Sequence, residues 1–488
     1  MENLTPMMKQ YMTIKEQYPD SILFFRLGDF YEMFFDDAIL ASKELEIALT
    51  KRAGGMGAKV PMCGIPHHVS EGYIARLVEK GYKVAVCDQI EDPALAKGIV
   101  KRDVIRVVTP GTITDSSALD AKSNNFLVSI YMDNFGVGLS YVDNSTGEMF
   151  TTEYLGEVAD IYSFVLDELG KTFPSEIICN KTFTENNRNM KTIKNKINPF
   201  INVYEDVNLL EKHHTNILEL FKVKSHEDLE IKDKMYSILA TNKLIEYLYA
   251  TQKNTLDHIN QLTYYEPQHY MVMDINTRAN LEIHETIMSR DKKGALIHIL
   301  DKTSTAMGGR LLKNWLEQPL ISTDKINYRL NVVQYFTENL IILDEVRDLL
   351  KTVYDIERIS SKVTTGNCNG RDFISLKNSL SILPELKKIL TLTDCSELIQ
   401  ISKDMDALED IFQIIDDAIE ESPPIGVKDG GLIKKGYSAE LDKIRESSLK
   451  GKQWLGDLEA KERDKTGIKN LKIGYNRIAG YFFEVTKS

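Results

Sequence analysis

The sequence contains few cysteines and no C-x-x-C pair. Its 488 residues include five cysteines, which are scattered along the chain: Cys63, Cys87, Cys179, Cys368 and Cys395. Zinc sites and disulfide frameworks require cysteines at characteristic spacings, so this pattern favours free thiols in a reducing cytoplasm.

Long apolar runs are also missing. No run reaches the ~20 apolar residues that span a bilayer, and the polar N-terminus lacks the apolar core of a secretory signal. The content of 43% hydrophobic and 27% charged residues is ordinary for a water-soluble protein. At this length the chain should form several domains. We therefore expect a multidomain cytoplasmic protein that does not contact a membrane.

The chain lacks an overall positive charge, since its formal net charge is −12. This argues against indiscriminate binding to nucleic acid. Two stretches nevertheless have a positive local charge. Residues 443–488 hold 11 basic and 6 acidic residues, and residues 51–106 hold 10 basic and 6 acidic residues. Such stretches suit either contacts with DNA phosphates or solvated faces of mixed charge.

No complete phosphate-binding or metal-binding motif is present. Gly170-Lys171-Thr172 supplies only the end of the pattern G-x-x-x-x-G-K-[ST], because Val165 stands where the first glycine is required. Asp143 lies at the end of a predicted strand, like the acidic residues of ribonuclease H-like nucleases. Two-metal cleavage needs several converging carboxylates, and the sequence offers no clear second one, so a polar turn is favoured. His67-His68 lacks ligand-like neighbours and is interpreted as a loop pair beside Pro66.

The stretch over residues 23–34 is rich in aromatic side chains, which predicts an extended strand. Side chains alternate along a strand, so Phe30 and Glu32 should share one face while Tyr31 points into the fold. The pattern alone allows an ordinary buried strand with Glu32 at its rim. It also allows Phe30 to act as a wedge between stacked bases, with Glu32 hydrogen-bonded to the displaced base.

An ordered series of motifs resembles the N-terminal part of the MutS family, whose members recognise mismatched DNA. The motifs are T-P-M-M at 5–8, G-D-F-Y-E at 28–32, L-T-K-R at 49–52, P-M-C-G-I-P-H-H at 61–68, V-T-P-G-T at 108–112, D-I-N-T-R-A-N-L-E at 274–282, D-G-G at 429–431 and G-Y-F at 480–482. In that family, the phenylalanine of the Phe-x-Glu motif stacks on the mispaired base and the glutamate hydrogen-bonds it. The resemblance assigns these roles to Phe30 and Glu32.

The expected fold class is multidomain α/β plus all-α. We expect a mismatch-recognition α/β domain over residues 1–112, a linker over 113–124 and an α/β connector domain over 125–250, which the resemblance implies is ribonuclease H-like. A lever domain of long helices should follow over 257–442, and a β-rich clamp domain should begin over 443–488. The resemblance implies that the rest of the clamp and the ATPase domain of the family lie outside this sequence.

Local patterns predict the main elements of each domain. Helices are predicted over residues 7–18, 37–47, 69–80, 281–288, 299–316, 326–340, 343–353, 376–390 with a break near Pro384, 408–419, and from Ser438 toward Trp454. Strands are predicted over 23–34, 49–52, 83–87, 104–108, 127–131, 136–143, 177–179, 203–204, 468–475 and 478–485.

The resemblance also implies partners. Phosphate contacts are expected from Lys51, Arg52, Lys101, Arg102 and Arg106 in the first domain, and from Lys469, Lys472 and Arg477 in the clamp. The complete family protein is a DNA-dependent ATPase that uses ATP, ADP and Mg²⁺, forms a homodimer and recruits MutL. This chain is expected to be non-catalytic, cytoplasmic and associated with the nucleoid.

Two other functions remain open from the sequence. A nuclease would need the carboxylate set that was not found. A helical adaptor or scaffold would bind DNA backbone without recognising bases.

Overall fold

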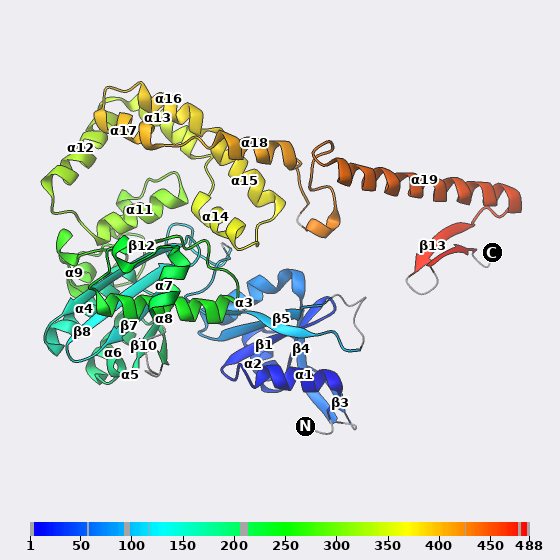
Figure 1. Ribbon diagram of the computed structural model, residues 1–488, viewed down its shortest axis with the longest axis horizontal. Coiled ribbons are helices and arrows are strands. Elements are labelled where there is room, and N and C mark those ends of the chain that lie inside the picture. Colours follow the sequence, from blue (N-terminus) through cyan, green and yellow to red (C-terminus); the bar gives the residue numbers. More distant parts are fainter. Residues whose placement is uncertain are drawn as a thin grey trace. The chain divides into compact units, whose positions relative to one another are not determined.

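The computed structural model describes residues 4–55, 58–91, 98–115, 117–204, 213–424, 426–476 and 480–485 (Figure 1). As predicted, mixed α/β structure is followed by a helix-rich region and a small C-terminal sheet. The chain forms two compact units: Met1–Cys368 with Asn378–Ala407, and Asn369–Lys377 with Leu408–Ser488. Over the described residues, no helix is both long enough and apolar enough to cross a bilayer.

The first α/β domain is built on a six-stranded sheet with the order β3-β4-β2-β1-β5-β6. Its strands are β1 (Ser21–Leu27), β2 (Phe30–Phe34), β3 (Thr50–Gly55), β4 (Ala58–Pro66), β5 (Lys83–Gln89) and β6 (Arg102–Val108). β1 and β5 are parallel, and the other neighbouring strands are antiparallel. The helices are α1 (Pro6–Lys15), α2 (Phe35–Leu45) and α3 (Ser70–Glu79), with a short 3₁₀ turn at His67–Val69.

Both faces of this sheet are covered. On one face, Tyr31 and Met33 pack with residues of α2 and α3. On the other face, Phe25 and Phe34 pack with Met8 and other residues of α1. The alternation of side chains along β2 therefore serves two cores at once, as expected for a strand at the middle of a covered sheet.

One prediction in this domain is wrong. Residues 23–34 do not form a single strand but a hairpin, because Gly28 adopts a φ of +58° between β1 and β2. Leu27 pairs with Phe30, so Gly28 and Asp29 form the two-residue turn. Glycine at the first position of such a turn accommodates a positive φ without the steric penalty of a Cβ atom. Phe30 therefore lies at the tip of a hairpin.

The second α/β domain contains another six-stranded sheet, with the order β11-β10-β7-β8-β9-β12. Its strands are β7 (Phe126–Met132), β8 (Gly136–Asp143), β9 (Glu148–Leu155), β10 (Glu176–Asn180), β11 (Phe200–Tyr204) and β12 (Gln261–Tyr264). Its helices are α4 (Val158–Thr172), α5 (Lys181–Thr184), α6 (Asn187–Lys196), α7 (His213–Phe221) and α8 (Met235–Gln252). Residues of α4, α5 and α6 pack in one apolar core and residues of α7 and α8 in another, so helices cover both faces.

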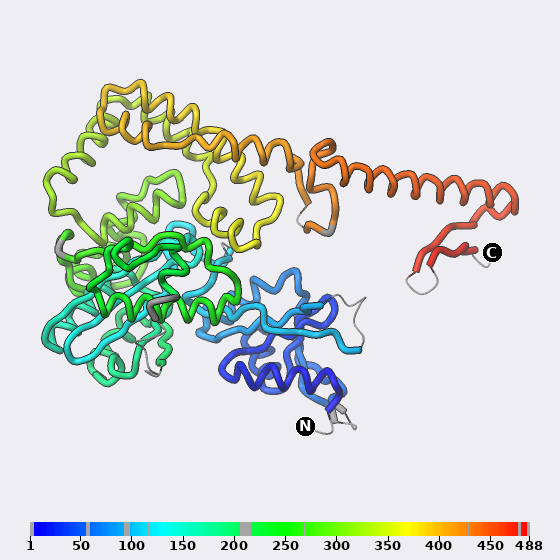
Figure 2. The backbone as a smooth tube through the Cα atoms, viewed as in Figure 1, coloured from blue at the N-terminus to red at the C-terminus, as the bar shows by residue number. Residues whose placement is uncertain are grey.

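The second domain extends beyond its predicted end, and the predicted linker makes contacts of its own. In Figure 2 the chain completes the first domain (blue) before it enters the second (cyan to green). The sheet of the second domain, however, includes β12, which lies beyond residue 250 and pairs in parallel with β9. The predicted linker over 113–124 is also packed against the helix-rich region, because Arg310 and Arg358 donate hydrogen bonds to its backbone carbonyls. A polar, Ser/Asp-rich composition resembles that of a free linker and does not reveal such contacts.

The helix-rich region contains α9 (Ile275–Asn280), α10 (Leu296–Leu300), α11 (Ala306–Glu317), α12 (Thr323–Glu338), α13 (Leu340–Leu350), α14 (Ile356–Thr364), α15 (Gly370–Ser381), α16 (Leu383–Thr391), α17 (Ser396–Asp404) and α18 (Glu409–Ala418). The predicted break near Pro384 is confirmed, since the proline lies in the first turn of α16, where no backbone N–H is required. The predicted helix over 281–288 is wrong. Turns and bends occupy those residues, and Glu282 has a φ of +49°. The helices α9, α14 and α17 were not predicted.

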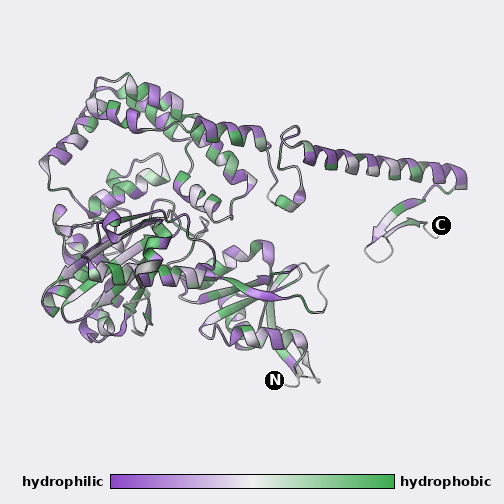
Figure 3. Cartoon of the chain, viewed as in Figure 1, coloured by the Kyte–Doolittle hydropathy of each residue, from purple (hydrophilic) through white to green (hydrophobic). Residues whose placement is uncertain are grey.

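The second unit ends with a long helix and a small hairpin. The helix predicted from Ser438 is α19 (Ala439–Thr466), which continues beyond Trp454; Ser438 caps it by accepting a hydrogen bond from the backbone N–H of Leu441 at 3.3 Å. The helix ends at Gly467, which has a φ of +70°. β13 (Lys472–Asn476) and β14 (Gly480–Glu484) then pair in antiparallel fashion. Figure 3 shows α19 as mainly hydrophilic, and none of its residues is buried.

Candidate nucleic-acid interface

Phe30 and Glu32 share one face of β2, as the strand alternation predicted. Phe30 is 47% exposed at the hairpin tip, whereas Tyr31 between them is 5% exposed. The register places Leu27 and Pro66 on either side of Phe30. A large apolar ring is thus held in solvent by a strand whose next residues are anchored in the core.

Tyr31 is the anchor that fixes the direction of the neighbouring side chains. Its hydroxyl donates a hydrogen bond to Asp88 Oδ2 at 2.9 Å, and the guanidinium of Arg26 lies 5.4 Å from the centre of its ring. Burial and the Asp88 carboxylate raise the pKa of Tyr31. With Tyr31 held in this way, β2 cannot slip by one residue without exposing the ring and burying Glu32.

Glu32 is bound by a cation from β3, which lies two strands away in the sheet. Nη1 of Arg52, on β3, forms an ion pair with Glu32 Oε2. The strand between them places Gly64 opposite Glu32. A Cβ atom at Gly64 would lie 3.4 Å from Glu32 Cγ and 3.3 Å from the carbonyl oxygen of Tyr31, so the glycine leaves room for the Glu32 side chain. Sequence reasoning missed this pair, although a glycine inside the strand motif P-M-C-G-I-P was a usable signal.

The predicted phosphate contacts of the first domain differ in accessibility. Lys51 and Lys101 are exposed. Arg106 is partly buried and pairs with Glu71. Arg102 must be removed from the set: it is 9% exposed, and its guanidinium donates to the carbonyl oxygens of Arg26 at 2.6 Å and Val100 at 2.8 Å. Arg102 therefore stabilises the edge strand β6, which a sequence count of basic residues cannot distinguish from a surface role.

The predicted clamp contacts lie in the second unit. Lys469 and Lys472 are exposed, in the turn after α19 and at the start of β13. Arg477 lies outside the described residues. The two lysines therefore remain candidates for phosphate binding.

The histidine pair lies at the end of β4, close to the hairpin tip. The backbone N–H of His67 donates to the carbonyl oxygen of Asp29 at 2.9 Å, which ties the 3₁₀ turn to the β1–β2 turn. Within the described residues, no group of three or more His, Cys, Asp or Glu side chains is arranged to hold a metal ion. The geometry assigns His67 to the support of the hairpin.

The V-T-P-G-T motif contacts the second domain. Thr109, Thr112 and Glu176 are buried, and the backbone N–H of Gly111 donates to Glu176 Oε2 at 2.9 Å. The hydroxyl of Thr109 binds the same carboxylate oxygen. Burial raises the pKa of Glu176. The residues that end the first domain are thus fixed to the first residue of β10.

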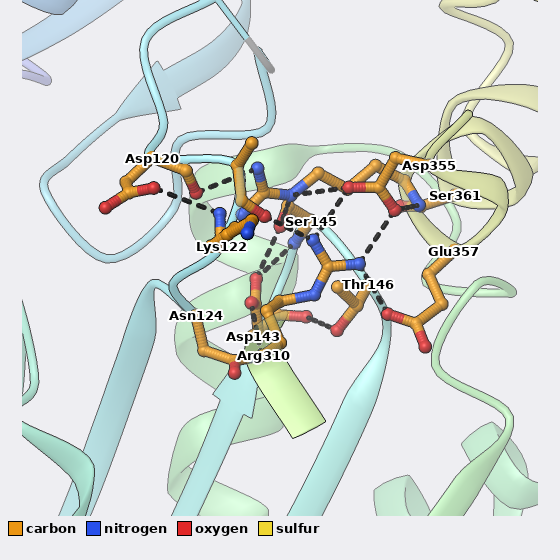
Figure 4. Close-up of polar contacts among 12 residues, drawn as sticks. Asp120, Lys122, Asn124, Asp143, Ser145, Thr146, Arg310, Asp355, Glu357 and Ser361 are labelled. Carbon is orange, nitrogen blue, oxygen red and sulfur yellow. Dashed lines mark hydrogen bonds and ion pairs between the residues drawn. The ribbon is translucent and has the colours of Figure 1, made fainter. Parts of the chain in front are cut away.

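A buried polar junction joins the second domain, the segment 113–124 and the helix-rich region (Figure 4). Arg310, from α11, binds Asp355 through two hydrogen bonds of 2.7 Å and donates to the carbonyl oxygen of Ala121 at 2.8 Å. Arg358, from α14, donates to the carbonyl oxygens of Asp120 at 3.2 Å and Ser123 at 2.9 Å. Both arginines are 3% exposed.

The structure locates Asp143 and the partial phosphate-binding motif Gly170-Lys171-Thr172. Asp143, at the end of β8, accepts hydrogen bonds from the Ser145 hydroxyl at 2.7 Å and from Asn124 Nδ2 at 2.9 Å, and so belongs to this junction. Gly170-Lys171-Thr172 forms the last turn of α4. Such a motif binds phosphate at the N-terminus of a helix, whereas these residues lie at the C-terminal end of α4.

The chain is similar over its whole length to curated bacterial proteins named DNA mismatch repair protein MutS. It is 48% identical to the protein from Alkaliphilus oremlandii over 494 residues and 48% identical to the one from Acetivibrio thermocellus over 491 residues. The protein from Ruminiclostridium cellulolyticum is 47% identical over 488 residues. All of this chain is covered in each case, against 56%, 56% and 55% of the relatives, so it spans just over half of their length.

Three family models match in order along the chain. MutS domain I covers residues 5–117, MutS domain II covers 125–260, and MutS domain III covers 276–473. The first match contains the Phe30 hairpin, and the second contains the whole of the second sheet except Gln261–Tyr264. The chain therefore belongs to the MutS family.

Proposed function

We propose that this chain binds mismatched DNA, with Phe30 inserted at the mispaired step through the minor groove and Glu32 hydrogen-bonded to the disturbed base. The observation that carries the proposal is the exposure of Phe30, 47%, on the same strand face as Glu32. Apolar wedges of this kind unstack base steps and kink the duplex toward the major groove.

Discrimination follows from deformation energy. A mispaired step is already poorly stacked, so inserting a ring there costs less than at a paired step, where unstacking takes roughly a few kcal/mol. A hydrogen bond from Glu32 adds to this difference. Because neither effect requires a base code, one site can serve many mismatches and small unpaired loops.

Backbone contacts supply affinity without sequence preference. Lys51 and Lys101 are the exposed candidates in the first domain, and Lys469 and Lys472 those in the second unit. Each neutralised phosphate steepens the salt dependence of binding. These lysines would bind the duplex backbone, and Phe30 would insert where base stacking is weak.

The complete protein would couple this recognition to other steps. The names of the relatives indicate a role in DNA mismatch repair. By family membership, we extend the proposal to a homodimer that binds and hydrolyses ATP with Mg²⁺, recruits MutL and acts in the cytoplasm at the nucleoid. Within this chain, the proposed role is binding and not catalysis.

The test is competition binding of matched and mismatched duplexes to the full-length protein and to its Phe30→Ala variant. The variant should keep most nonspecific affinity and lose the preference for mismatches. Ile39→Ala is the matched control, because Ile39 is similarly exposed (50%) on α2 of the same domain, and this variant should keep the preference. A Phe30→Ala variant with the same preference as the wild type would refute the wedge.

A further inference from the structure

The ion pair with Arg52 occupies the Glu32 carboxylate, which is the group proposed to contact the base. Arg52 reaches Glu32 from β3, across β4, and the Arg52 side chain is 41% exposed while that of Glu32 is 15% exposed. One end of the pair is thus open to solvent and to any duplex that lies on this face. The pair is neither buried in the core nor free on the surface.

The ion pair holds the Glu32 carboxyl group in one direction. Its Oε2 atom is bound by Nη1 of Arg52, which reaches across β4 from β3, whereas the Phe30 ring stands on β2 itself. To reach a base beside the Phe30 ring, the carboxyl group must turn away from Arg52. The Arg52 side chain is 41% exposed, so water can solvate the guanidinium that this movement releases.

We infer that Arg52 is a positioning residue for mismatch recognition, which holds Glu32 until a mispair is present and then releases it. This inference rests on the proposed function of Phe30 and Glu32. On matched DNA the pair stays intact and presents little net charge to the duplex. On mismatched DNA, Glu32 exchanges its cation for a base.

This inference predicts the direction in which the mismatch preference changes when Arg52 is removed. Removing Arg52 removes a competitor for Glu32 in the mismatch complex. It also leaves an unpaired carboxylate facing the phosphates of matched DNA, which repels them. Both effects raise the ratio of mismatched to matched affinity, while the loss of one positive charge lowers both affinities.

Arg52→Gln should therefore weaken binding to both duplexes but increase the mismatch preference by about two- to five-fold, the range of a partly exposed ion pair. Lys51→Gln is the matched control. Lys51 is the preceding residue on β3, is exposed, and forms no ion pair with the residues that the structure describes. It should lower both affinities and leave the ratio unchanged.

The experiment is competition binding of matched and mismatched duplexes to the full-length protein, with Arg52→Gln placed in the wild-type and Glu32→Gln backgrounds. The increase in preference should appear in the wild-type background and disappear in the Glu32→Gln background, and Arg52→Lys should restore much of the wild-type ratio. An unchanged ratio in Arg52→Gln, or an equal change in both backgrounds, would overturn the inference.

Phe30→Ala in the same assay separates this failure from a failure of the proposed function. If Phe30→Ala abolishes the preference while Arg52→Gln leaves the ratio unchanged, recognition by Phe30 stands and only the role of Arg52 is lost. If Phe30→Ala retains the preference, the proposed function itself fails.

Discussion

Two arginine–carboxylate arrangements in this molecule have opposite characters. Arg310 is 3% exposed, and its guanidinium binds Asp355 by two hydrogen bonds and Glu357 by another of 2.6 Å. Arg52 is 41% exposed at its side chain and contacts Glu32 through one nitrogen. Buried pairs are costly to break, whereas half-exposed pairs are readily exchanged. The buried arrangement therefore suits a fixed joint and the exposed one a contact that DNA can replace.

The fixed joint also determines the path of the chain after the first domain. Arg310 and Arg358 bind three residues of the segment 113–124 through their carbonyl oxygens. Backbone carbonyls are available in any sequence, so these contacts depend on the path of the chain and not on its side chains. The segment thereby connects the recognition domain to the helix-rich region directly.

The largest expected effect comes from breaking the buried arrangement. Arg310→Met leaves Asp355 and Glu357 without this cation and should destabilise the protein by about 3–5 kcal/mol. Urea unfolding of wild type and variant measures the difference. Lys351→Met is the control, because both side chains of the Lys351–Asp348 pair are exposed (66% and 73%). This variant should change the free energy of unfolding by less than about 1 kcal/mol. Equal effects of the two variants would contradict the distinction between buried and exposed pairs.

A second effect concerns a buried histidine beside the same joint. Burial lowers the pKa of His258 to about 4, and its Nε2 lies 3.0 Å from Asn144 Oδ1. The unfolded chain takes up a proton near pH 6.5 but the folded chain only near pH 4, so stability should fall as the pH drops through this window. The loss at pH 4 should approach about 3 kcal/mol.

His258→Gln should flatten this part of the pH profile of stability, measured by urea unfolding between pH 4 and pH 7. The exposed residue His298 supplies the control, and His298→Gln should keep the wild-type profile. A profile for His258→Gln as steep as that of the wild type would show that other groups dominate.

The smallest expected effect concerns the exchangeable contact itself. We hypothesise that Glu32 takes up a proton in the negative field of the duplex and donates a hydrogen bond to the base. Glu32→Gln can donate the same bond and should keep mismatch affinity within about two- to three-fold, whereas Glu32→Ala should lose about five- to ten-fold. Wild-type mismatch affinity should also rise as pH falls. A Glu32→Gln variant that loses as much affinity as Glu32→Ala would refute proton donation.

The sequence predicted the fold class, with α/β structure before a helix-rich region and a small sheet, and the face shared by Phe30 and Glu32. Strand alternation was sufficient there, because Tyr31 between them had to be buried. Helix ends with a clear signal were also predictable, as at Ser438 and Pro384. The hairpin turn at Gly28 was missed although Gly28-Asp29 is a turn dipeptide, because the aromatic and apolar residues before and after it were interpreted as one strand; Gly28 adopts a positive φ between the two strands.

The contacts between distant segments were not predictable from local pattern. Arg52 and Arg102 both count as basic residues of the first domain, yet one pairs with Glu32 and the other donates to backbone carbonyls. The junction at Arg310 depends on residues far apart in the chain, since Arg310 and Asp355 are separated by 45 in sequence number. Periodicity reports on neighbours three or four residues away and carries no information at that distance.

The most direct test of the central claim is the bend of the DNA. Energy transfer between dyes at the two ends of a short mismatched duplex should increase when the wild-type protein saturates it, because the inserted Phe30 ring kinks the duplex. The account predicts that Phe30→Ala, also at saturation, leaves the duplex nearly straight. An equal increase in energy transfer with both proteins would contradict it.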